Sequence, residues 1–153
     1  MARPTLIVVL SLLAGQVRPA AGQLQVNGLR NLTFGNLTRG IPKYVPPSDP
    51  AISGEFDIIT AIGNSVRIVF TLPTQLNGPA GATLPISFGN SDAIAISTRP
   101  NSTPVTFDPK KAKNLNNFNS TRYLIFLGGT ASPAANQQVG NYTGTVTMTV
   151  TLR

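Results

Sequence analysis

The sequence contains no cysteine, no histidine and no tryptophan, and only 11% of its residues are charged. Ordinary soluble domains have about 25% charged residues. Without cysteine or histidine the chain cannot form a zinc finger, an iron–sulfur site, a cysteine nucleophile or a Ser-His-Asp triad. These absences predict no metal ion and no cofactor, and they argue against an enzyme. The carboxylates are few, namely Asp49, Glu55, Asp57, Asp92 and Asp108.

The chain also lacks a hydrophobic run long enough to cross a membrane. Its longest run, residues 6–14, is shorter than the roughly 20 residues that a transmembrane helix needs. The run follows Arg3 and precedes Ala20-Ala21-Gly22, which is the order of a secretory signal peptide and its cleavage site. Residues 1–22 are therefore predicted to be a cleaved signal peptide. No transmembrane anchor is expected in the mature chain, and a lipoprotein signal is excluded because it needs a cysteine.

The remaining residues, 23–153, are predicted to form one domain. The chain of 153 residues carries a formal net charge of +7, and a domain of this size can bury enough surface to fold without disulfides. An exported protein without cysteine must be stabilised by side-chain packing and by hydrogen bonds between strands. The 14 glycines and 13 prolines divide the sequence into short segments, as is typical of strands joined by turns.

The C-terminal segment has the clearest pattern. From Tyr142 to Leu152, apolar or small residues alternate with threonines. Successive side chains of a strand point to opposite faces of a sheet, so a strand is predicted with one face in the core and a threonine face in water. The core face comprises Tyr142, Gly144, Val146, Met148, Val150 and Leu152.

Further strands are expected where alternating or β-branched runs lie between glycine and proline clusters. They cover residues 32–37, 54–59, 66–72, 84–88, 93–97 and 123–127, and Gly63-Asn64 is predicted to close a hairpin between the second and the third. Residues 40–50 and 114–120 are expected to be loops, with Phe118 packed beneath the latter. The pattern predicts an all-β fold, namely an antiparallel sandwich of about seven or eight strands. A closed barrel is the alternative.

Two groups of charged side chains are candidate sites. Glu55 and Asp57 share the outward face of a predicted strand, but a glycosidase pair normally comes from separate elements of a cleft. We therefore interpret them as exposed surface acids. Lys110, Lys111 and Lys113 form a basic cluster, which we interpret as part of a solvated loop. Nucleic-acid binders combine concentrated positive charge with aromatic side chains, so no nucleic-acid partner is expected.

Several segments, taken in order, resemble a family of exported bacterial proteins known as domain of unknown function 4402. The resemblance covers residues 31–152. Its most specific part is residues 134–145, where small residues and glutamines lead into Gly-x-Tyr-x-Gly before an alternating strand. The C-terminus departs from the family, which often ends on an aromatic residue where this chain has Leu152-Arg153. The other matching segments are Leu32-Thr33-Phe34-Gly35, Ser53-Gly54-Glu55-Phe56, Gly63-Asn64-Ser65-Val66, Thr71-Leu72-Pro73 and residues 124–130.

The resemblance implies a fold and a compartment, because the family has no established biochemical activity. Its plan is similar to that of spore-coat-U-type domains and of chaperone–usher pilins, whose immunoglobulin-like subunits accept a strand from a neighbouring subunit. The resemblance therefore implies a non-enzymatic structural protein of a Gram-negative bacterium, in the periplasm, at the cell surface or outside the cell. Its partner is expected to be a second copy or another exported subunit, bound by strand addition.

Two sets of residues are candidates for contact with a partner. The segment 23–29 is interpreted either as a donor strand for a neighbour or as the first strand of its own domain. The candidates for strand pairing are Leu24, Val26, Tyr142, Val146, Met148 and Val150. The alternative function is a monomeric secreted or periplasmic module that binds a carbohydrate or a protein, and an exposed Tyr44 beside Phe118 would favour it. Its candidate contacts are Tyr44, Lys110, Lys111 and Lys113.

Overall fold

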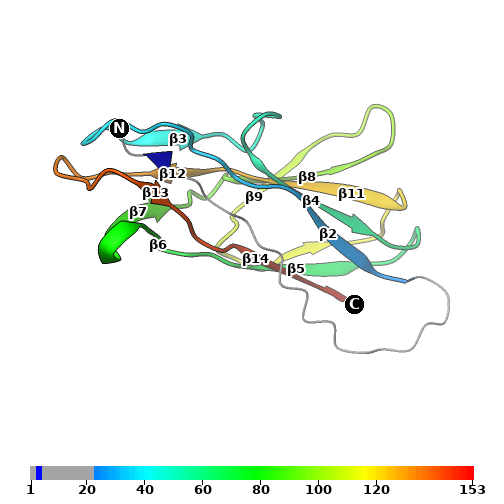
Figure 1. Ribbon diagram of the computed structural model, residues 1–153. Coiled ribbons are helices and arrows are strands. Elements are labelled where there is room, and N and C mark those ends of the chain that lie inside the picture. Colours follow the sequence, from blue (N-terminus) through cyan, green and yellow to red (C-terminus); the bar gives the residue numbers. More distant parts are fainter. Residues whose placement is uncertain (1–2, 5–22) are drawn as a thin grey trace.

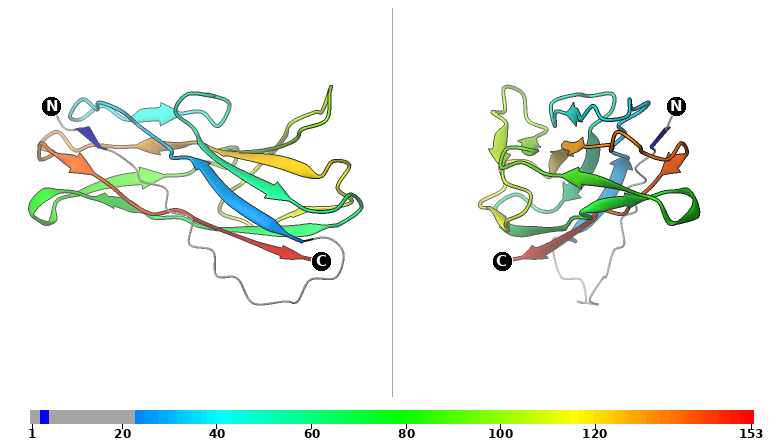
Figure 2. Two further views of the ribbon diagram at one scale, coloured as in Figure 1. Left: turned by 45° about the vertical axis from the view of Figure 1, so that its right-hand side comes forward. Right: turned by 90° about the vertical axis from the view of Figure 1, so that its left-hand side faces the viewer.

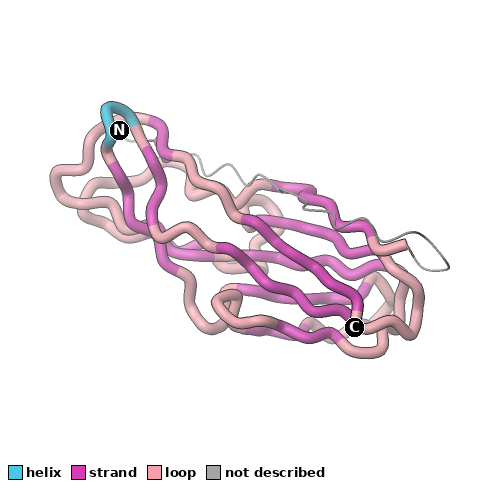
Figure 3. Tube along the Cα trace, turned by 90° about the horizontal axis from the view of Figure 1, so that it is seen from below, coloured by secondary structure: helices cyan, strands magenta, loops and turns pink. Residues whose placement is uncertain are grey.

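The structure, a computed structural model, describes residues 3–4 and 23–153. Apart from Arg3–Pro4, the predicted signal peptide at residues 1–22 lies outside the described residues. The described chain is all-β with one short 3-10 helix, η1 (Pro79–Gly81), and its strands run mainly along the long axis of the molecule (Figure 1, Figure 3). In chain order the strands are β1 (Arg3–Pro4), β2 (Gln25–Arg30), β3 (Lys43–Val45), β4 (Gly54–Ile59), β5 (Val66–Thr71), β6 (Gln75–Asn77), β7 (Thr83–Ser87), β8 (Ala93–Ser97), β9 (Val105–Phe107), β10 (Lys113–Leu115), β11 (Arg122–Leu127), β12 (Gly129–Ala131), β13 (Asn141–Tyr142) and β14 (Thr147–Leu152).

Five strands form the largest antiparallel sheet, in the order β2-β4-β11-β8-β9. Alternation along β4 places Phe56 and Ile58 on the inner face of this sheet, and alternation along β11 places Ile125 and Leu127 beside them. All four side chains are fully buried. The two-residue period of the sequence is thus matched by one face of the sheet.

The central strand of this sheet continues past a glycine. Gly128 separates β11 from β12, and β12 pairs with β3 on one side and with β7 on the other. A Cβ atom on Gly128 would lie 2.3 Å from the carbonyl oxygen of Val45, so a residue without a side chain is needed for this close approach. Because β6 pairs with the far edge of β7, the strands β3-β12-β7-β6 extend the sheet toward one end of the molecule (Figure 2).

A third antiparallel sheet, β10-β5-β14, lies on the other side of the core. Phe70 of β5 meets Phe56 of β4 edge-to-face, with ring centroids 5.8 Å apart. A bridge between Asn77 and Thr143 connects β6 to the chain that follows β13, and β13 also pairs in parallel with β1. The hydrophobic core is enclosed between these sheets.

The predicted core is largely confirmed. Val150 is half-buried and packs against the core, whereas Leu152, which was expected on the core face, is 48% exposed. The strands predicted at residues 54–59, 66–72, 84–88, 93–97 and 123–127 match β4, β5, β7, β8 and β11 to within one residue at each end. The buried members of the predicted core are Phe34, Phe56, Ile58, Val66, Ile68, Phe70, Tyr142, Val146 and Met148.

The predicted hairpin at Gly63-Asn64 is wrong. A turn does form there, because Gly63 has a φ of +89° and the N–H of Asn64 donates to the carbonyl oxygen of Ala61 at 3.3 Å. However, β4 pairs with β2 and β11, whereas β5 pairs with β10 and β14. The turn therefore carries the chain from one sheet to another, since both edges of β4 are occupied by other strands.

Three further expectations need correction. Residues 32–37 do not form a strand, although Leu32, Phe34 and Leu37 are buried; Gly35 has a left-handed φ of +64° that interrupts the extended chain. The predicted loop at residues 40–50 contains β3, and the predicted loop at residues 114–120 begins inside β10. Phe118 is fully buried, as predicted.

Candidate functional site

The C-terminal strand β14 is hydrogen-bonded along one edge only. It pairs antiparallel with β5 over all 6 of its residues, and among the described residues no strand pairs with its other edge. The edge strand of the five-stranded sheet, β2, runs along the same side of the molecule (Figure 1, Figure 2). No strand pairing joins β2 to β14, so the fold leaves two long strand edges on this side.

One hydrogen bond shows which residues of β14 direct their backbone groups to the open edge. The N–H of Arg153 donates to the carbonyl oxygen of Ser65 at 2.9 Å. In an antiparallel ladder, alternate residues direct both their N–H and their C=O toward the same neighbour. The register therefore points Thr147, Thr149 and Thr151 toward β5. The residues whose backbone groups point to the open edge are Met148, Val150 and Leu152.

The side chains of β14 become more exposed toward its C-terminal end. Val146, just before the strand, is fully buried and Met148 is 1% exposed. Val150 is half-buried, and Leu152 is 48% exposed. An apolar side chain and unpaired backbone groups are thus exposed together at the end of the open edge.

A buried tyrosine fixes the segment that leads into β14. The hydroxyl of Tyr142 donates to the carbonyl oxygen of Gln138 at 2.7 Å and accepts a hydrogen bond from Nε2 of Gln137 at 2.6 Å. The same nitrogen of Gln137 donates to the carbonyl oxygen of Thr83 at 3.0 Å. Because Tyr142 is fully buried, these bonds satisfy polar groups that have lost contact with water. The sequence block Gln-Gln-Val-Gly-Asn-Tyr therefore forms a rigid corner before β14.

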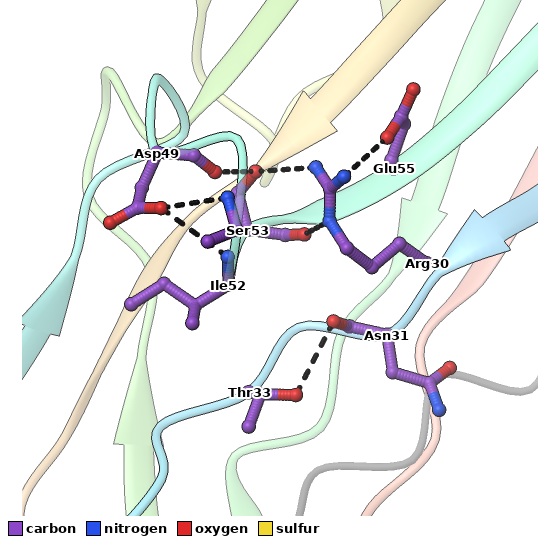
Figure 4. Close-up of polar contacts among 8 residues, drawn as sticks. Arg30, Asn31, Thr33, Asp49, Ile52, Ser53 and Glu55 are labelled. Atoms are coloured by element: carbon purple, nitrogen blue, oxygen red, sulfur yellow. Dashed lines mark hydrogen bonds and ion pairs between the residues drawn. The ribbon is translucent and has the colours of Figure 1, made fainter.

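The other long edge, β2, is interrupted. Its register with β4 shifts between Gly28 and Arg30, and such a bulge twists an edge strand away from further pairing. The guanidinium of Arg30 lies 2.7 Å from a carboxylate oxygen of Glu55, and it donates to the carbonyl oxygen and the hydroxyl of Ser53 at 2.9 and 3.3 Å (Figure 4). Charge and irregular backbone thus occupy this end of β2.

The first strand of the predicted mature chain belongs to its own domain. Residues 25–30 pair with β4 as β2, Val26 is 6% exposed and Leu24 packs half-buried against the core. Of the two interpretations of the segment 23–29, the structure shows the strand of its own sheet. Leu24 and Val26 therefore contribute to the core beside the open edge.

The interpretation of Glu55 and Asp57 as exposed acids is wrong: Glu55 is half-buried and paired with Arg30, and Asp57 is 3% exposed. Its carboxylate accepts hydrogen bonds from Nδ2 of Asn27 at 2.8 Å and from Nε of Arg122 at 2.9 Å, and a second guanidinium nitrogen lies 2.8 Å away. The three residues come from the neighbouring strands β2, β4 and β11. Asp57 therefore joins three strands rather than forming half of a catalytic pair with Glu55.

The short edge strands carry residues that oppose pairing with another chain. Lys43 lies on β3, Lys113 lies on β10, and β9 is bounded closely by Pro104 and Pro109. Lysine and proline at sheet edges are common protections against strand addition. The sequence of β14, Thr-Met-Thr-Val-Thr-Leu, contains neither charge nor proline. Among the described strands, β14 is thus a long edge without such protection.

Tyr44 is 52% exposed but does not converge with Phe118. Tyr44 lies on β3, and its hydroxyl donates to Oδ1 of Asp92 at 3.0 Å. Partial burial of the phenol, followed by its hydrogen bond to Asp92 and the negative charge of that carboxylate, raises the pKa of Tyr44. Phe118 is fully buried and packs on Tyr123 with ring centroids 4.1 Å apart. The two aromatic residues therefore do not form one ligand-binding surface.

The three lysines make contacts near their own loop. Nζ of Lys110 donates to Asn90 at 2.9 Å and lies 3.9 Å from Asp108, and Nζ of Lys111 lies 3.7 Å from the same carboxylate. Nζ of Lys113 lies 5.9 Å from the centroid of the Phe107 ring. These contacts partly neutralise the cluster, in agreement with a solvated loop.

No group of three or more acidic, histidine or cysteine side chains is placed to hold a metal ion within residues 3–4 and 23–153. In the described part of the chain, no helix is long and apolar enough to span a membrane. Comparisons of the chain with family models, with curated proteins and with solved structures found no match. The resemblance to the exported bacterial family thus rests on the sequence segments quoted above.

Sequence reasoning predicted one strand from Tyr142 to Leu152, but Tyr142 belongs to β13 and only Thr147–Leu152 form β14. It also missed the network around Asp57. Its members are separated by 30 and 65 residues along the chain, and no local pattern pairs residues over such distances. The sequence signal that could have indicated the network is a charged residue, Asp57, within an otherwise apolar part of a strand. Its burial follows from the order of the strands in the sheet.

Proposed function

We propose that this chain is an exported, non-enzymatic structural protein with an immunoglobulin-like, pilin-like sandwich. It binds a second copy of itself or another exported subunit by strand addition at β14. The observation that carries the proposal is the open edge of β14, which is uncharged, free of proline and paired on one side over 6 residues. Unpaired N–H and C=O groups along such an edge are a template for another strand.

The incoming strand hydrogen-bonds to the backbone of Met148, Val150 and Leu152. Main-chain bonds supply affinity in this mode of recognition, and alternate side chains supply register. Every second side chain of the partner packs next to Val150 and the exposed Leu152. The rigid corner around Tyr142 holds the edge in position, so little conformational entropy is lost when the partner binds.

Export is supported by two features of the sequence. The apolar run at residues 6–14 is flanked as in a signal peptide, and the segments between residues 31 and 152 resemble an exported bacterial family. The periplasm or the surface of a Gram-negative bacterium is the proposed compartment.

The test is the oligomeric state of two matched variants of the exported chain. Val150→Lys places a charge on the edge strand beside the open backbone groups, a change that opposes pairing. Val69→Lys is the control, because this substitution introduces the same charge on the central strand β5. The side chain of Val69 is 39% exposed. Both proteins are measured by light scattering after size exclusion, with a thermal melt to verify folding.

We expect the natural chain and Val69→Lys to form dimers or polymers, and Val150→Lys to remain a folded monomer. A natural chain that is monomeric at every concentration, alone and with other exported subunits, would contradict strand addition. That result would favour the monomeric binding module. Equal assembly of both variants would show that another surface makes the contact.

A further inference from the structure

The loops at the end of the molecule where β4 and β8 end and β11 begins (Figure 1) surround a shallow, open recess. It consists of two adjoining cavities of about 560 and 420 Å³. The larger is lined by residues 117–121 with Ile62, the smaller by residues 100–103 with parts of β8, β9 and β11, and Arg99 and Asn119 line both. Small-molecule sites commonly have volumes of roughly 300 to 1,000 Å³.

The recess contains a positive charge and no acidic side chain. Arg99 is exposed and lines both cavities. The acidic residues are all held elsewhere: Glu55 by Arg30, Asp57 by Arg122, Asp92 by Tyr44, Asp108 by lysines, and Asp49 by the N–H groups of residues 51 and 52. No Asp or Glu carboxylate of the described chain therefore lines the recess beside Arg99.

Amide and hydroxyl side chains are the most numerous of the remaining lining residues, which also present apolar surface. They are neutral donors and acceptors of the kind that bind sugar hydroxyl groups, since each offers one or more hydrogen bonds in either direction. Tyr123, Pro100 and Ile62 add apolar surface for the C–H groups of a sugar ring. The polar lining residues are Asn101, Ser102, Thr103, Asn117, Asn119, Ser120 and Thr121.

Hydrogen bonds hold the walls of the recess in place. The hydroxyl of Tyr123 donates to Oδ1 of Asn119 at 2.7 Å, and the hydroxyls of Ser97 and Ser102 are joined at 3.0 Å. The N–H of Phe118 donates to the carbonyl oxygen of Asn64 at 2.8 Å, which anchors the loop before β11 to the turn after β4. Walls fixed in this way reduce the entropy lost when a ligand binds.

Two asparagines at the rim have a left-handed backbone conformation. Asn101 has a φ of +59° and Asn117 a φ of +52°. Asparagine adopts positive φ more readily than most residues other than glycine, and it does so in turns. Both residues line the recess, one in each cavity.

We infer that this recess binds an acidic saccharide, that is, a sugar chain with carboxylate groups. A guanidinium and a carboxylate form two parallel hydrogen bonds, so Arg99 recognises the acid while the amides and hydroxyls of the loops bind the sugar hydroxyls. The formal net charge, +7 for the chain and +5 (7 − 2) once Arg3 and Arg18 leave with the proposed signal peptide, attracts such a polyanion to the protein. The site is separate from the open edge of β14, and the inference does not depend on strand addition.

The test is calorimetric titration of the full chain with tri-galacturonate at physiological salt. The fully methyl-esterified trisaccharide is the ligand control, because it keeps the sugar hydroxyls and loses the charges. Arg99→Gln removes the guanidinium from the recess. Arg67→Gln is the protein control, since Arg67 is exposed on β5, lines neither cavity, and carries the same charge.

We expect saturable binding of tri-galacturonate that Arg99→Gln weakens at least about tenfold, as expected for a charge-assisted hydrogen bond. Arg67→Gln changes the affinity by less than about twofold, because long-range attraction is screened at this salt concentration. Three results would overturn the inference: no saturable binding at millimolar ligand, equal losses in the two arginine variants, or equal binding of the acid and its methyl ester.

Discussion

Asp57 is the most buried charged residue of the described chain. Its carboxylate is 3% exposed and accepts hydrogen bonds from two neighbouring strands. Asp57→Asn keeps the shape and removes the charge, so Arg122 loses its ionic partner. The side chain of Arg122 is 42% exposed, so water compensates in part. We expect a loss of about 1–3 kcal/mol in the free energy of unfolding, measured by urea denaturation.

Glu55→Gln is the matched control for this measurement. Glu55 is paired with Arg30, and both side chains reach solvent, at 18% and 29% exposure. Pairs that reach solvent contribute less than about 1 kcal/mol. Equal losses for Asp57→Asn and Glu55→Gln would show that burial of Asp57 has no energetic consequence.

The raised pKa of Tyr44 predicts that the free energy of unfolding depends on pH in the alkaline range. Partial burial and the neighbouring Asp92 raise the pKa of Tyr44, so the folded state favours the protonated phenol. This stabilisation is complete below the unfolded pKa of about 10 and is lost as pH rises through the higher folded pKa. The difference in unfolding free energy between the natural chain and Tyr44→Phe is therefore expected to narrow above about pH 10. A difference that stays constant in urea titrations across this range would contradict the assignment.

At the scale of residues, the sequence predicts which side chains are buried better than it predicts which side chains bond to one another. Phe56, Ile58 and Met148 are buried because strict alternation assigns each to a face. The contacts of Asp57 were not predictable in this way, since Asn27 and Arg122 lie 30 and 65 residues away. The recess around Arg99 was missed for the same reason.

Among the structural elements, the strand formed by β11 and β12 depends on one glycine. A Cβ atom on Gly128 would lie 2.3 Å from the carbonyl oxygen of Val45, whereas on Gly54 its nearest neighbour would be a Leu32 Cβ atom at 3.4 Å. Gly128→Ala is therefore expected to lower the free energy of unfolding by about 1–3 kcal/mol, as other overpacked interiors do. Gly54→Ala is expected to cost less. Chemical denaturation of both variants measures the difference, and equal values would contradict this account of the strand.

Local pattern predicts strands but not the pairing between them. The turn at Gly63 was recognised, yet β4 and β5 belong to different sheets because β2 and β11 occupy both edges of β4. Strands β3, β6, β9, β10 and β12 have 3 residues each, too few for alternation to be recognised. The open edge of β14 is likewise a property of the whole sheet, because it depends on which strands are neighbours.

At the scale of the whole molecule, the two proposed contacts use different surfaces. The open edge offers backbone groups of β14, whereas the recess offers side chains of the loops at one end of the molecule. A subunit joined to its neighbours by β14 can therefore still present Arg99 to a saccharide. Loss of one function through Val150→Lys or Arg99→Gln is expected to leave the other intact.

Amide hydrogen exchange, followed by NMR over a range of protein concentrations, tests strand addition at β14 most directly. In the dilute monomer, the amides of Thr149 and Thr151 are expected to be protected by β5, and those of Met148, Val150 and Leu152 to exchange rapidly. As the protein assembles, alone or with its partner subunit, the three rapid amides are expected to become protected. Assembly that leaves these three amides in rapid exchange would contradict strand addition at β14.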